Sequence, residues 1–336
     1  MKAFVAARIT DEWLDEIKKH FVVEQSFHFS QGNLPPSQLI EKMKDCHLAV
    51  IENDDVPAEV LAACPALFAL VDFRGTTSNV DVEEATRQGV VVLNTPGRNA
   101  DAVADFAVGM MIACARNVLA GIDTIRSNAW IDNGPRRAYV TLQGYDLSGK
   151  TIGLVGLGAI GRLVCKRLSG FDVKLVGYDP YVSAQAASQF GVEWLPLDEV
   201  MARADIVSLH VPLNESTCGM IGETQLRAMK PSACLVNTAR ADVVNRAALL
   251  RCLQEGWISG AALDVFSEEP IGSQDPLAQF PNVICTPHLG GATRDVVANQ
   301  SKIGVNGLLA FLNGETPSNC VNPQAMKAAR QKLSKQ

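Results

Sequence analysis

Residues 151–161 read Thr-Ile-Gly-Leu-Val-Gly-Leu-Gly-Ala-Ile-Gly, an apolar run that ends in three glycines spaced as GxGxxG. Residues 151–155 predict a buried strand, and the glycines predict a tight turn that opens into a helix over 160–168. Three glycines alone are a weak signal. A strand before them and a helix after them, however, are the arrangement of a dinucleotide-binding loop.

Each glycine has a physical task in such a loop. Gly156 permits the tight turn, Gly158 lets the backbone approach a pyrophosphate, and Gly161 lets the helix and strand pack closely. The N–H groups at the start of the helix, at Ala159 and Ile160, are free to bind phosphate charge. We therefore predict that this loop binds a dinucleotide, and a tight turn without a ligand is the alternative.

An acidic residue completes the pattern, because Asp179 follows Gly161 by 18 residues, at the end of the next expected strand. Its carboxylate can accept hydrogen bonds from both ribose hydroxyls of NAD. The 2′-phosphate of NADP would meet that negative charge unfavourably, and no Arg follows directly to compensate it. The sequence therefore predicts NAD as the cofactor.

Short apolar runs alternate with helical patterns along most of the chain, which predicts βαβ units and parallel sheets covered on both faces. Before residue 98 the expected strands are 2–7, 21–27, 48–51, 69–73 and 90–93, with helices over 11–19, 36–44 and 58–64. After residue 150 they are 151–155, 174–178, 206–210, 234–237, 261–265 and 283–285, with helices over 160–168, 223–229 and 246–255. We expect an α/β protein with two doubly wound parallel sheets.

Other segments do not follow this alternation of strands and helices. Residues 101–126 predict one long buried helix capped by Asn99 or Asp101, and residues 128–149 predict an ordered loop. Residues 293–312 predict another long helix, and the basic segment 326–336 predicts a frayed tail.

The composition is that of a folded protein of about two domains. The chain has 336 residues, 47% hydrophobic and 20% charged, with a net charge of −6 at neutral pH. Such mild acidity argues against nucleic-acid binding, and no window reaches the ~18 apolar residues of a membrane span. The first residues do not form a signal peptide. We expect a cytoplasmic protein without a membrane or nucleic-acid partner.

The nine cysteines follow neither a metal-binding nor a disulfide pattern. None lies in a CxxC or Cys/His ligand spacing, and several lie within apolar stretches, for example Cys114, Cys165, Cys234 and Cys285. We interpret them as small core residues in a reducing compartment, and we expect no bound metal.

Candidate catalytic side chains follow the last three expected strands: Arg240, the pair Glu268 and Glu269, and His288. In an open α/β sheet, ligands bind outside the carboxyl ends of the strands. Carbonyl reduction by a nicotinamide needs a proton donor such as His, a carboxylate that orients it, and a cation for the substrate. Taken singly, His288 could be a capping group, Glu268 and Glu269 could be a solvated pair, and Arg240 could contact a helix C-terminus. Together they favour a catalytic site.

The chain resembles the NAD-dependent D-2-hydroxyacid dehydrogenases, the family of phosphoglycerate, glycerate and D-lactate dehydrogenases. The resemblance runs over residues 72–293 through GLGAIG, YDP, HVPLNEST, MKPSACLVNTAR, GAALDVFSEEP and NVICTPHLGGAT. It implies a Rossmann NAD-binding domain, 99–289, inserted into a flavodoxin-like substrate domain, 1–98 plus 290–336. It also implies an active site in the cleft between the domains, hinge helices over 101–126 and 293–312, and a homodimer built on the NAD domain.

The resemblance further implies roles for single residues. Arg240 resembles the family's substrate-binding Arg, Glu269 its His-orienting carboxylate, and His288 its acid/base. Asp264 resembles the residue that holds the nicotinamide amide, and Glu268 is a neighbour without a role. The implied cofactor contacts are Gly156, Gly158, Ala159, Ile160, Gly161, Asp179, Val211, Pro212, Thr238, Asp264 and Gly290.

One segment departs from the family pattern. The family's substrate loop is usually apolar and reads like GxGxDxxD, whereas residues 73–81 read Phe-Arg-Gly-Thr-Thr-Ser-Asn-Val-Asp. Its N–H groups can still hold a carboxylate, and we expect Arg74, Gly75 and Thr76 to contact the substrate. The hydroxyl-rich wall favours a small polar 2-keto acid over an aliphatic one. Three more arginines are either further anion contacts or surface residues: Arg98, Arg136 and Arg137.

The leading prediction is an enzyme that interconverts a small polar 2-keto acid and the D-2-hydroxy acid with NAD. One alternative is a phosphoglycerate dehydrogenase of the short type, since the chain has no room for the regulatory domain that many such enzymes append. The other is an NADH-sensing co-repressor, although those proteins typically carry disordered tails that this sequence lacks.

Overall fold

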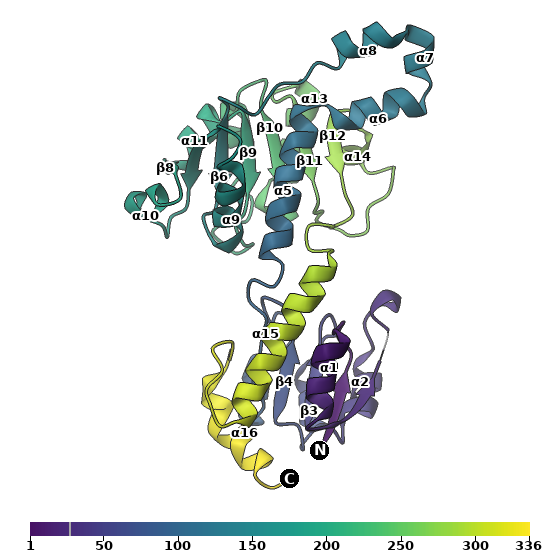
Figure 1. The fold of residues 1–336 in the computed structure, drawn as a ribbon, viewed down its shortest axis with the longest axis vertical. Coiled ribbons are helices and arrows are strands. Elements are labelled where there is room, and N and C mark those ends of the chain that lie inside the picture. Colours follow the sequence, from purple (N-terminus) through teal and green to yellow (C-terminus); the bar gives the residue numbers. More distant parts are fainter. Residues whose placement is uncertain (27) are drawn as a thin grey trace. The chain divides into compact units, whose positions relative to one another are not determined.

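The computed structural model describes residues 1–26 and 28–336, and Phe27, the last residue of the expected strand 21–27, lies outside the described residues. The chain forms two compact units (Figure 1). Unit 1 consists of Met1–Arg98 and Thr293–Gln336, and unit 2 consists of Asn99–Ala292. The chain returns to unit 1 at Thr293, three residues beyond the expected position, 290.

Unit 1 is built on a five-stranded parallel sheet. Its strands are β1 (Lys2–Val5), β2 (Val22–Gln25), β3 (Leu48–Ile51), β4 (Ala69–Asp72) and β5 (Val91–Leu93). The order β2-β1-β3-β4-β5 is the flavodoxin-like order of a doubly wound sheet. The middle strands β3 and β4 are buried on both faces, which explains why they are continuous apolar runs rather than alternating ones.

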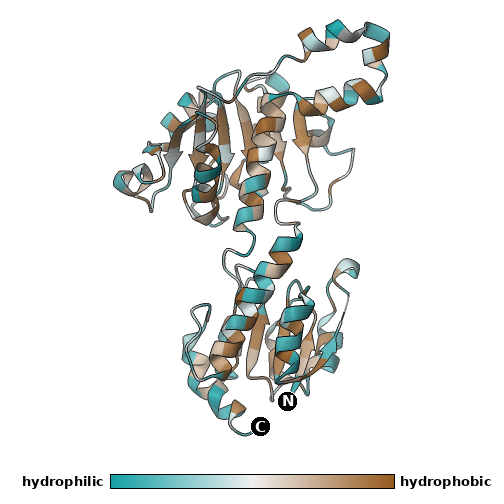
Figure 2. Cartoon of the chain, viewed as in Figure 1, coloured by the Kyte–Doolittle hydropathy of each residue, from teal (hydrophilic) through white to brown (hydrophobic). Residues whose placement is uncertain are grey.

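Helices cover both faces of this sheet. They are α1 (Asp11–Lys18), α2 (Pro36–Met43), α3 (Ala58–Ala62), α4 (Val82–Arg87), α15 (Arg294–Leu312) and α16 (Met326–Leu333), with short 3-10 turns η1 (Phe29–Gln31) and η3 (Pro323–Ala325). One core layer joins the sheet to α1, α15 and α16, and the other joins it to α2, α3 and α4. Figure 2 shows strands that are largely apolar and helices that mix polar and apolar residues.

The C-terminal segment is a helix that is packed on unit 1, so the expectation of a frayed tail over 326–336 was wrong. Met326 and Ala329, three residues apart, are buried on the same side of α16. The Asn322 side chain ties the chain just before α16 to β5, because its Oδ1 accepts the N–H of Val92 at 2.8 Å and its Nδ2 donates to the carbonyl of Val90 at 3.0 Å.

Unit 2 contains a seven-stranded parallel sheet. Its strands are β6 (Thr151–Val155), β7 (Lys174–Tyr178), β8 (Val192–Trp194), β9 (Ile206–Leu209), β10 (Cys234–Asn237), β11 (Gly260–Leu263) and β12 (Val283–Cys285). The order is β12-β11-β10-β9-β6-β7-β8, a Rossmann arrangement with one added edge strand. Six strands were expected, and β8 was missed because an edge strand of three residues with a charged centre gives no apolar run.

Ten helices and one 3-10 turn complete the described part of unit 2. They are α5 (Ala100–Ala115), α6 (Val118–Arg126), α7 (Ala129–Asn133), α8 (Pro135–Thr141), α9 (Ala159–Leu168), α10 (Ala184–Ser188), α11 (Leu197–Arg203), α12 (Glu223–Ala228), α13 (Arg246–Glu255), α14 (Pro276–Gln279) and η2 (Ala241–Val243). One core layer lies under α5, α9 and α10, and the other under α11 to α14.

The expected single helix over 101–126 is two helices, α5 and α6, which meet at an angle of 65°. The break lies where the chain before β6 crosses the end of α5. Tyr145 donates its N–H to the carbonyl of Ala115 at 2.9 Å, and a Cβ on Gly144 would lie 2.1 Å from that same oxygen. The carbonyl of Ala115 therefore bonds to a distant segment rather than continuing the helix, and Asn117 takes a left-handed conformation.

The expected loop over 128–149 contains the helices α7 and α8, so this expectation was also wrong. Gly134 and Pro135 are turn signals, and here they separate two short helices. Gly134 has a positive φ of 79°, and Pro135 occupies the first position of α8, where its missing N–H costs nothing.

No single helix in residues 1–26 and 28–336 is both long enough and apolar enough to cross a membrane. The bent pair α5 and α6 passes the same test of length and composition when taken together.

Asp72, the last residue of β4, places a carboxyl group in the interior of unit 1. The side chain is fully buried, and neither oxygen has a partner of hydrogen-bond geometry in the described residues. Burial raises the pKa of Asp72 to about 7, although Arg74 and Asn79 oppose the shift. The folded protein therefore holds a proton at Asp72 more tightly than the unfolded chain does.

We expect Asp72→Asn to change how stability depends on pH, because it keeps the shape of the side chain and removes the ionisable group. The stabilisation from protonated Asp72 is complete below its ordinary pKa of 3.8 and is lost as the pH rises through about 7. The variant should match the wild type at low pH and exceed it above neutrality, by about 4 kcal/mol at most. Urea unfolding below the ordinary pKa of 3.8 and above neutrality measures this. A variant that is less stable than the wild type only above neutrality would mean that ionised Asp72 has favourable partners.

Candidate active site

Three loops of unit 2 follow neighbouring strands of one parallel sheet. β10, β11 and β12 pair in register, so their carboxyl ends, at Asn237, Leu263 and Cys285, lie at one edge. The side chain of Asn237 shapes the first loop, accepting the N–H of Ala239 at 3.0 Å and donating to the carbonyl of Arg240 at 2.9 Å. This turn leaves the Arg240 side chain exposed at the sheet edge.

The other two loops bring His288 and Glu269 together. Nδ1 of His288 lies 2.9 Å from Oε2 of Glu269, and Oε1 of Glu269 accepts the N–H of Phe266 at 2.9 Å. The carboxylate is thus held at both oxygens. The His288 side chain is 50% exposed, and its Nε2 has no hydrogen-bond partner in residues 1–26 and 28–336. One ring nitrogen is therefore fixed and the other is available to a ligand.

The electrostatics of this edge favour an ionised Glu269. Partial burial raises its pKa, but the hydrogen bonds from His288 and from Phe266 and the positive charge of Arg240 outweigh burial, and the net shift is downward. Arg240 follows β10, and Glu269 belongs to the loop after β11, the neighbouring strand of the same sheet. The structure therefore brings Arg240, Glu269 and His288 to one edge of the unit 2 sheet.

Asp264, which follows β11, anchors the loop that carries His288. Its carboxylate accepts the hydroxyl of Thr286 at 2.6 Å and the N–H groups of Leu289 and Gly290, each at 2.7 Å. The side chain is 1% exposed, so these three donors compensate a buried charge. Its contacts within the described residues are thus with the loops after β11 and β12.

His288 itself has an uncommon backbone conformation, with φ of 54°. The left-handed region costs a residue with a Cβ energy unless its surroundings fix it. The bonds from Asp264 to the residues on both sides, Thr286 and Leu289, fix this segment. The strain therefore sets the direction in which the imidazole leaves the loop.

The pair lines a pocket of about 510 Å³ within unit 2. Glu269 and His288 form its polar part, and Phe266, Ile271 and Pro287 contribute apolar surface. The volume lies in the range of small-molecule sites.

The glycine loop lies between β6 and α9 as the sequence predicts. Gly156 has φ of 98°, and a Cβ there would lie 2.7 Å from the backbone of His210. A Cβ on Gly161 would lie 2.2 Å from the carbonyl of Gly156, which shows how closely helix and strand pack. A Cβ on Gly158, in contrast, would have nothing within 4 Å. The open side of the loop, at Gly158, Ala159 and Ile160, therefore leaves room for a phosphate at the start of α9.

Asp179 lies beside this loop, after β7. Its Oδ2 accepts the N–H of Leu157 at 2.8 Å, and its Oδ1 accepts the N–H of Tyr181 at 2.9 Å. The carboxylate is therefore oriented by the glycine loop. Tyr181 is among the most exposed large side chains of the described chain, at 89%.

Buried polar atoms without partners line the same edge. Thr238 Oγ1 and both ring nitrogens of His210 are buried and have no hydrogen-bond partner in the described residues. Burial lowers the pKa of His210 to about 4, so the ring is neutral. These atoms, with the open Gly158, fit a dinucleotide at this edge. Sequence reasoning missed His210, although its place directly after β9 and before Val211 and Pro212 was a usable signal.

The expected substrate loop lies in unit 1, after β4. The carbonyl of Arg74 accepts the N–H of Thr95 at 2.8 Å, and the carbonyl of Gly75 accepts Nδ2 of Asn94 at 3.0 Å. These bonds fix the backbone of the loop and leave Gly75 and Thr76 exposed. Arg74 is half-buried.

Of the further arginines, Arg98 is bound within unit 1. It forms an ion pair with Glu52, 3.1 Å between Nη1 and Oε1, and also donates to Gln300. Its charge is therefore compensated inside the protein rather than offered to an anion. Arg136 and Arg137 are exposed on α8. Residues 1–26 and 28–336 contain no cluster of three or more His, Cys, Asp or Glu side chains suited to a metal ion.

Comparison with known proteins identifies the family of this chain. Residues 108–290, more than half of the chain, match the family model described as D-isomer specific 2-hydroxyacid dehydrogenase, NAD binding domain. The match contains the glycine loop, Asp179, Arg240, Glu269 and His288.

Full-length relatives match over both units. A glyoxylate reductase of Korarchaeum cryptofilum is 39% identical over 97% of each chain, and one of Pyrococcus furiosus is 37% identical over 100% of this chain and 99% of its own. The structure of D-lactate dehydrogenase from Escherichia coli superimposes with a TM-score of 0.79 at 26% identity, covering 96% of this chain and all of that one. The chain therefore belongs to the D-isomer specific 2-hydroxyacid dehydrogenases, oxidoreductases that interconvert 2-keto and 2-hydroxy acids with a nicotinamide dinucleotide.

Proposed function

We propose that this protein reduces a small polar 2-keto acid to the D-2-hydroxy acid with NADH, and that the reaction is reversible. The observation that carries the proposal is the 2.9 Å bond between His288 and Glu269 at the sheet edge that also presents Arg240. When bound, the nicotinamide supplies the hydride, so the protein has to bind, orient and protonate the substrate.

His288 is the acid/base in this proposal. Glu269 holds Nδ1 and stabilises the protonated ring, and Nε2 is free to give a proton to the carbonyl oxygen as it gains negative charge. In the reverse direction the same nitrogen accepts the hydroxyl proton. Glu269 therefore orients and stabilises His288 without exchanging a proton with the substrate.

Arg240 binds the substrate in this proposal. Its guanidinium can hold a carboxylate and the neighbouring carbonyl oxygen in a two-pronged contact, which also polarises the carbonyl. In unit 1, the N–H groups and hydroxyls of the loop at Arg74, Gly75 and Thr76 are our candidates for further carboxylate contacts.

The substrate class we favour is a small 2-keto acid with a polar or absent side chain. The two relatives named above are glyoxylate reductases, and glyoxylate has no side chain at all. The hydroxyl-rich loop after β4, with Thr76, Thr77 and Ser78, adds support, since hydroxyls bind oxygen-bearing substrates better than aliphatic ones.

NAD is the proposed cofactor because the carboxylate of Asp179 lies beside the glycine loop, and a carboxylate there can accept hydrogen bonds from the ribose hydroxyls of NAD. The proposed contacts with the dinucleotide are Gly156, Gly158, Ala159, Ile160, Gly161, Asp179, Val211, Pro212, Thr238, Asp264 and Gly290. The carboxylate of Asp264 already accepts the N–H of Gly290. A dinucleotide that contacts either residue therefore has to share these two hydrogen-bonding groups.

A homodimer built on unit 2 is also proposed. Exposed apolar side chains gather on α6 to α8, a concentration that usually marks a protein interface. They are Val118, Ile122, Ile125, Trp130, Ile131, Tyr139 and Val140.

The nine cysteines are free thiols, which supports a reducing, cytoplasmic location.

We expect His288→Ala to lower kcat for 2-keto acid reduction by ~10²–10⁴, the usual contribution of a positioned acid/base. The measurement is NADH oxidation with glyoxylate, hydroxypyruvate, pyruvate and 2-ketoisocaproate, with His20→Ala, which changes an exposed histidine, as the matched control. Full activity of His288→Ala would remove His288 from the mechanism. A wild-type preference for 2-ketoisocaproate would overturn the polar substrate class.

We expect Asp179→Asn to weaken NADH binding and to reduce discrimination against NADPH on the order of 10-fold, because the amide keeps an acceptor for Leu157 but removes the charge. Titration of both cofactors by fluorescence measures this. Asp172→Asn serves as the control, since Asp172 has a left-handed backbone that Asn also adopts and lies outside the glycine loop. Unchanged selectivity in Asp179→Asn would show that Asp179 does not contact the ribose.

A further inference from the structure

Unit 1 contains three hydrogen-bonded side chains that the proposed reduction does not use. Ser26 and His28 follow β2, and Asp54 follows β3, so the three lie at the carboxyl edge of the unit 1 sheet, the edge at which ligands bind in open α/β sheets. Oγ of Ser26 lies 2.8 Å from Nδ1 of His28. Nε2 of His28 lies 2.8 Å from Oδ1 and 3.1 Å from Oδ2 of Asp54. We call this set the Ser26 triad.

Asp54 sets the direction of the hydrogen bonds in the Ser26 triad. An ionised carboxylate only accepts hydrogen bonds, so Nε2 of His28 carries the hydrogen. In the neutral ring Nδ1 is then the acceptor, and the hydroxyl of Ser26 donates to it. The proton of Ser26 is therefore directed at a base.

The fold holds both ends of the triad. The N–H of Ser26 donates to the carbonyl of Val5 at 2.9 Å, next to the ladder between β1 and β2. Oδ1 of Asp54 accepts the N–H of Leu34 at 2.9 Å, and the carbonyl of Asp54 accepts Nδ2 of Asn79 at 3.0 Å. These bonds fix the positions of the hydroxyl and the carboxylate on either side of the imidazole.

Burial changes along the triad as it does around a nucleophile. His28 is 8% exposed and Asp54 is 2% exposed, so the bond between them is shielded from water. The carboxylate can therefore stabilise the ring when the ring gains a proton. Ser26 is only half-buried, which leaves its hydroxyl within reach of a reactant.

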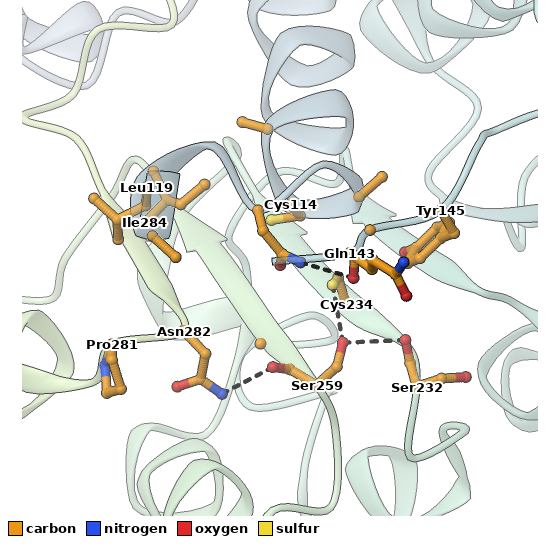
Figure 3. A pocket seen from close by; sticks show the side chains of 16 residues that line it. Cys114, Leu119, Gln143, Tyr145, Ser232, Cys234, Ser259, Pro281, Asn282 and Ile284 are labelled. Atoms are coloured by element: carbon orange, nitrogen blue, oxygen red, sulfur yellow. Dashed lines mark hydrogen bonds between the residues drawn. The ribbon is translucent and has the colours of Figure 1, made fainter. Parts of the chain in front are cut away.

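Ser259 illustrates the more usual bonding of a serine. It lines the pocket of about 260 Å³ at the amino ends of β10, β11 and β12, and its Oγ lies 3.0 and 2.9 Å from the carbonyl oxygens of Ser232 and Ala233 (Figure 3). A carbonyl accepts a hydrogen bond but does not take the proton. Within residues 1–26 and 28–336, Ser26 is the one serine whose hydroxyl contacts an imidazole.

We propose that Ser26 is a nucleophile toward carboxylic esters, with His28 as its base and Asp54 as the carboxylate that orients and stabilises the base. A hydroxyl, an imidazole and a carboxylate in this order are the arrangement that activates serine in hydrolases on unrelated folds. The two ring nitrogens are exchanged relative to those enzymes, since Nδ1 faces the serine and Nε2 faces the carboxylate.

The reaction proceeds in two steps. Oγ of Ser26 attacks the ester carbonyl and forms a C–O bond while Nδ1 of His28 takes the hydroxyl proton. The ester C–O bond breaks, the alcohol leaves with that proton, and the acyl group stays on Ser26. Water then attacks the acyl-serine and gives a proton to Nδ1. The carboxylic acid leaves, and His28 returns the proton to Oγ.

Esters with an acidic leaving group are the class expected to react most readily. A nitrophenolate leaves as an anion, so the first step then requires only that His28 remove the proton of Ser26. p-Nitrophenyl acetate, which has a small acyl group, is therefore the substrate for the test.

The first experiment treats the full chain with a fluorophosphonate, which forms a covalent bond to nucleophilic serines with loss of fluoride. We expect mass spectrometry of the digest to locate the adduct at Ser26. Ser26→Ala should lose the adduct. Ser30→Ala, which changes an exposed serine on η1, should keep it. A wild type without an adduct at Ser26 overturns the proposal, and because this mapping uses the wild type, a folding defect in a variant does not affect it.

The second experiment measures hydrolysis of p-nitrophenyl acetate. Ser26→Ala should lower kcat/KM by about 10²-fold or more, the usual contribution of a positioned base to its nucleophile. Ser30→Ala should hydrolyse the ester as the wild type does. His288→Ala should also do so, which excludes the exposed imidazole of unit 2 as the source of the activity. A rate in Ser26→Ala equal to that of the wild type overturns the proposal.

Discussion

The carboxylate of Asp264 is the interaction on which the site depends. It accepts three hydrogen bonds from the segment 286–290 and so holds His288 in a left-handed backbone that the residue would not adopt alone. Glu269 then fixes Nδ1 of the ring at 2.9 Å. Two carboxylates on the loop after β11 thus place one imidazole on the loop after β12. The bond from Glu269 to Nδ1 orients the ring and leaves Nε2 available.

Parallel pairing explains why residues so far apart in sequence meet. In register, β10, β11 and β12 end side by side, and the turns that follow them carry Arg240, Glu269 and His288. The glycine loop follows β6, which belongs to the same sheet and ends at the same edge. The opposite edge, where the strands begin, borders a second pocket that none of these residues lines.

Sequence patterns predicted the strands, turns and helices whose formation depends on residues that are neighbours in the sequence. The strand, turn and helix over 151–168 follow from glycine sterics and apolar periodicity, and the structure contains them. The break between α5 and α6 was not predictable locally, because Gly144 and Tyr145, some 30 residues away, take the carbonyl of Ala115. The same holds for the bonds of Asp264, since its three donors lie over 20 residues further along. The residue types of the site were visible in sequence, whereas their orienting bonds were not.

The most direct consequence of the Glu269–His288 bond is that Glu269 fixes the tautomer of His288, so that Nε2 exchanges the proton with the substrate. ¹⁵N NMR of the imidazole, in protein at a pH high enough for a neutral ring, measures which nitrogen carries the hydrogen. We expect the Nδ1–H tautomer, hydrogen-bonded to Glu269, and a shift toward the Nε2–H form in Glu269→Ala. A wild-type ring protonated at Nε2, or a tautomer that Glu269→Ala leaves unchanged, would contradict it.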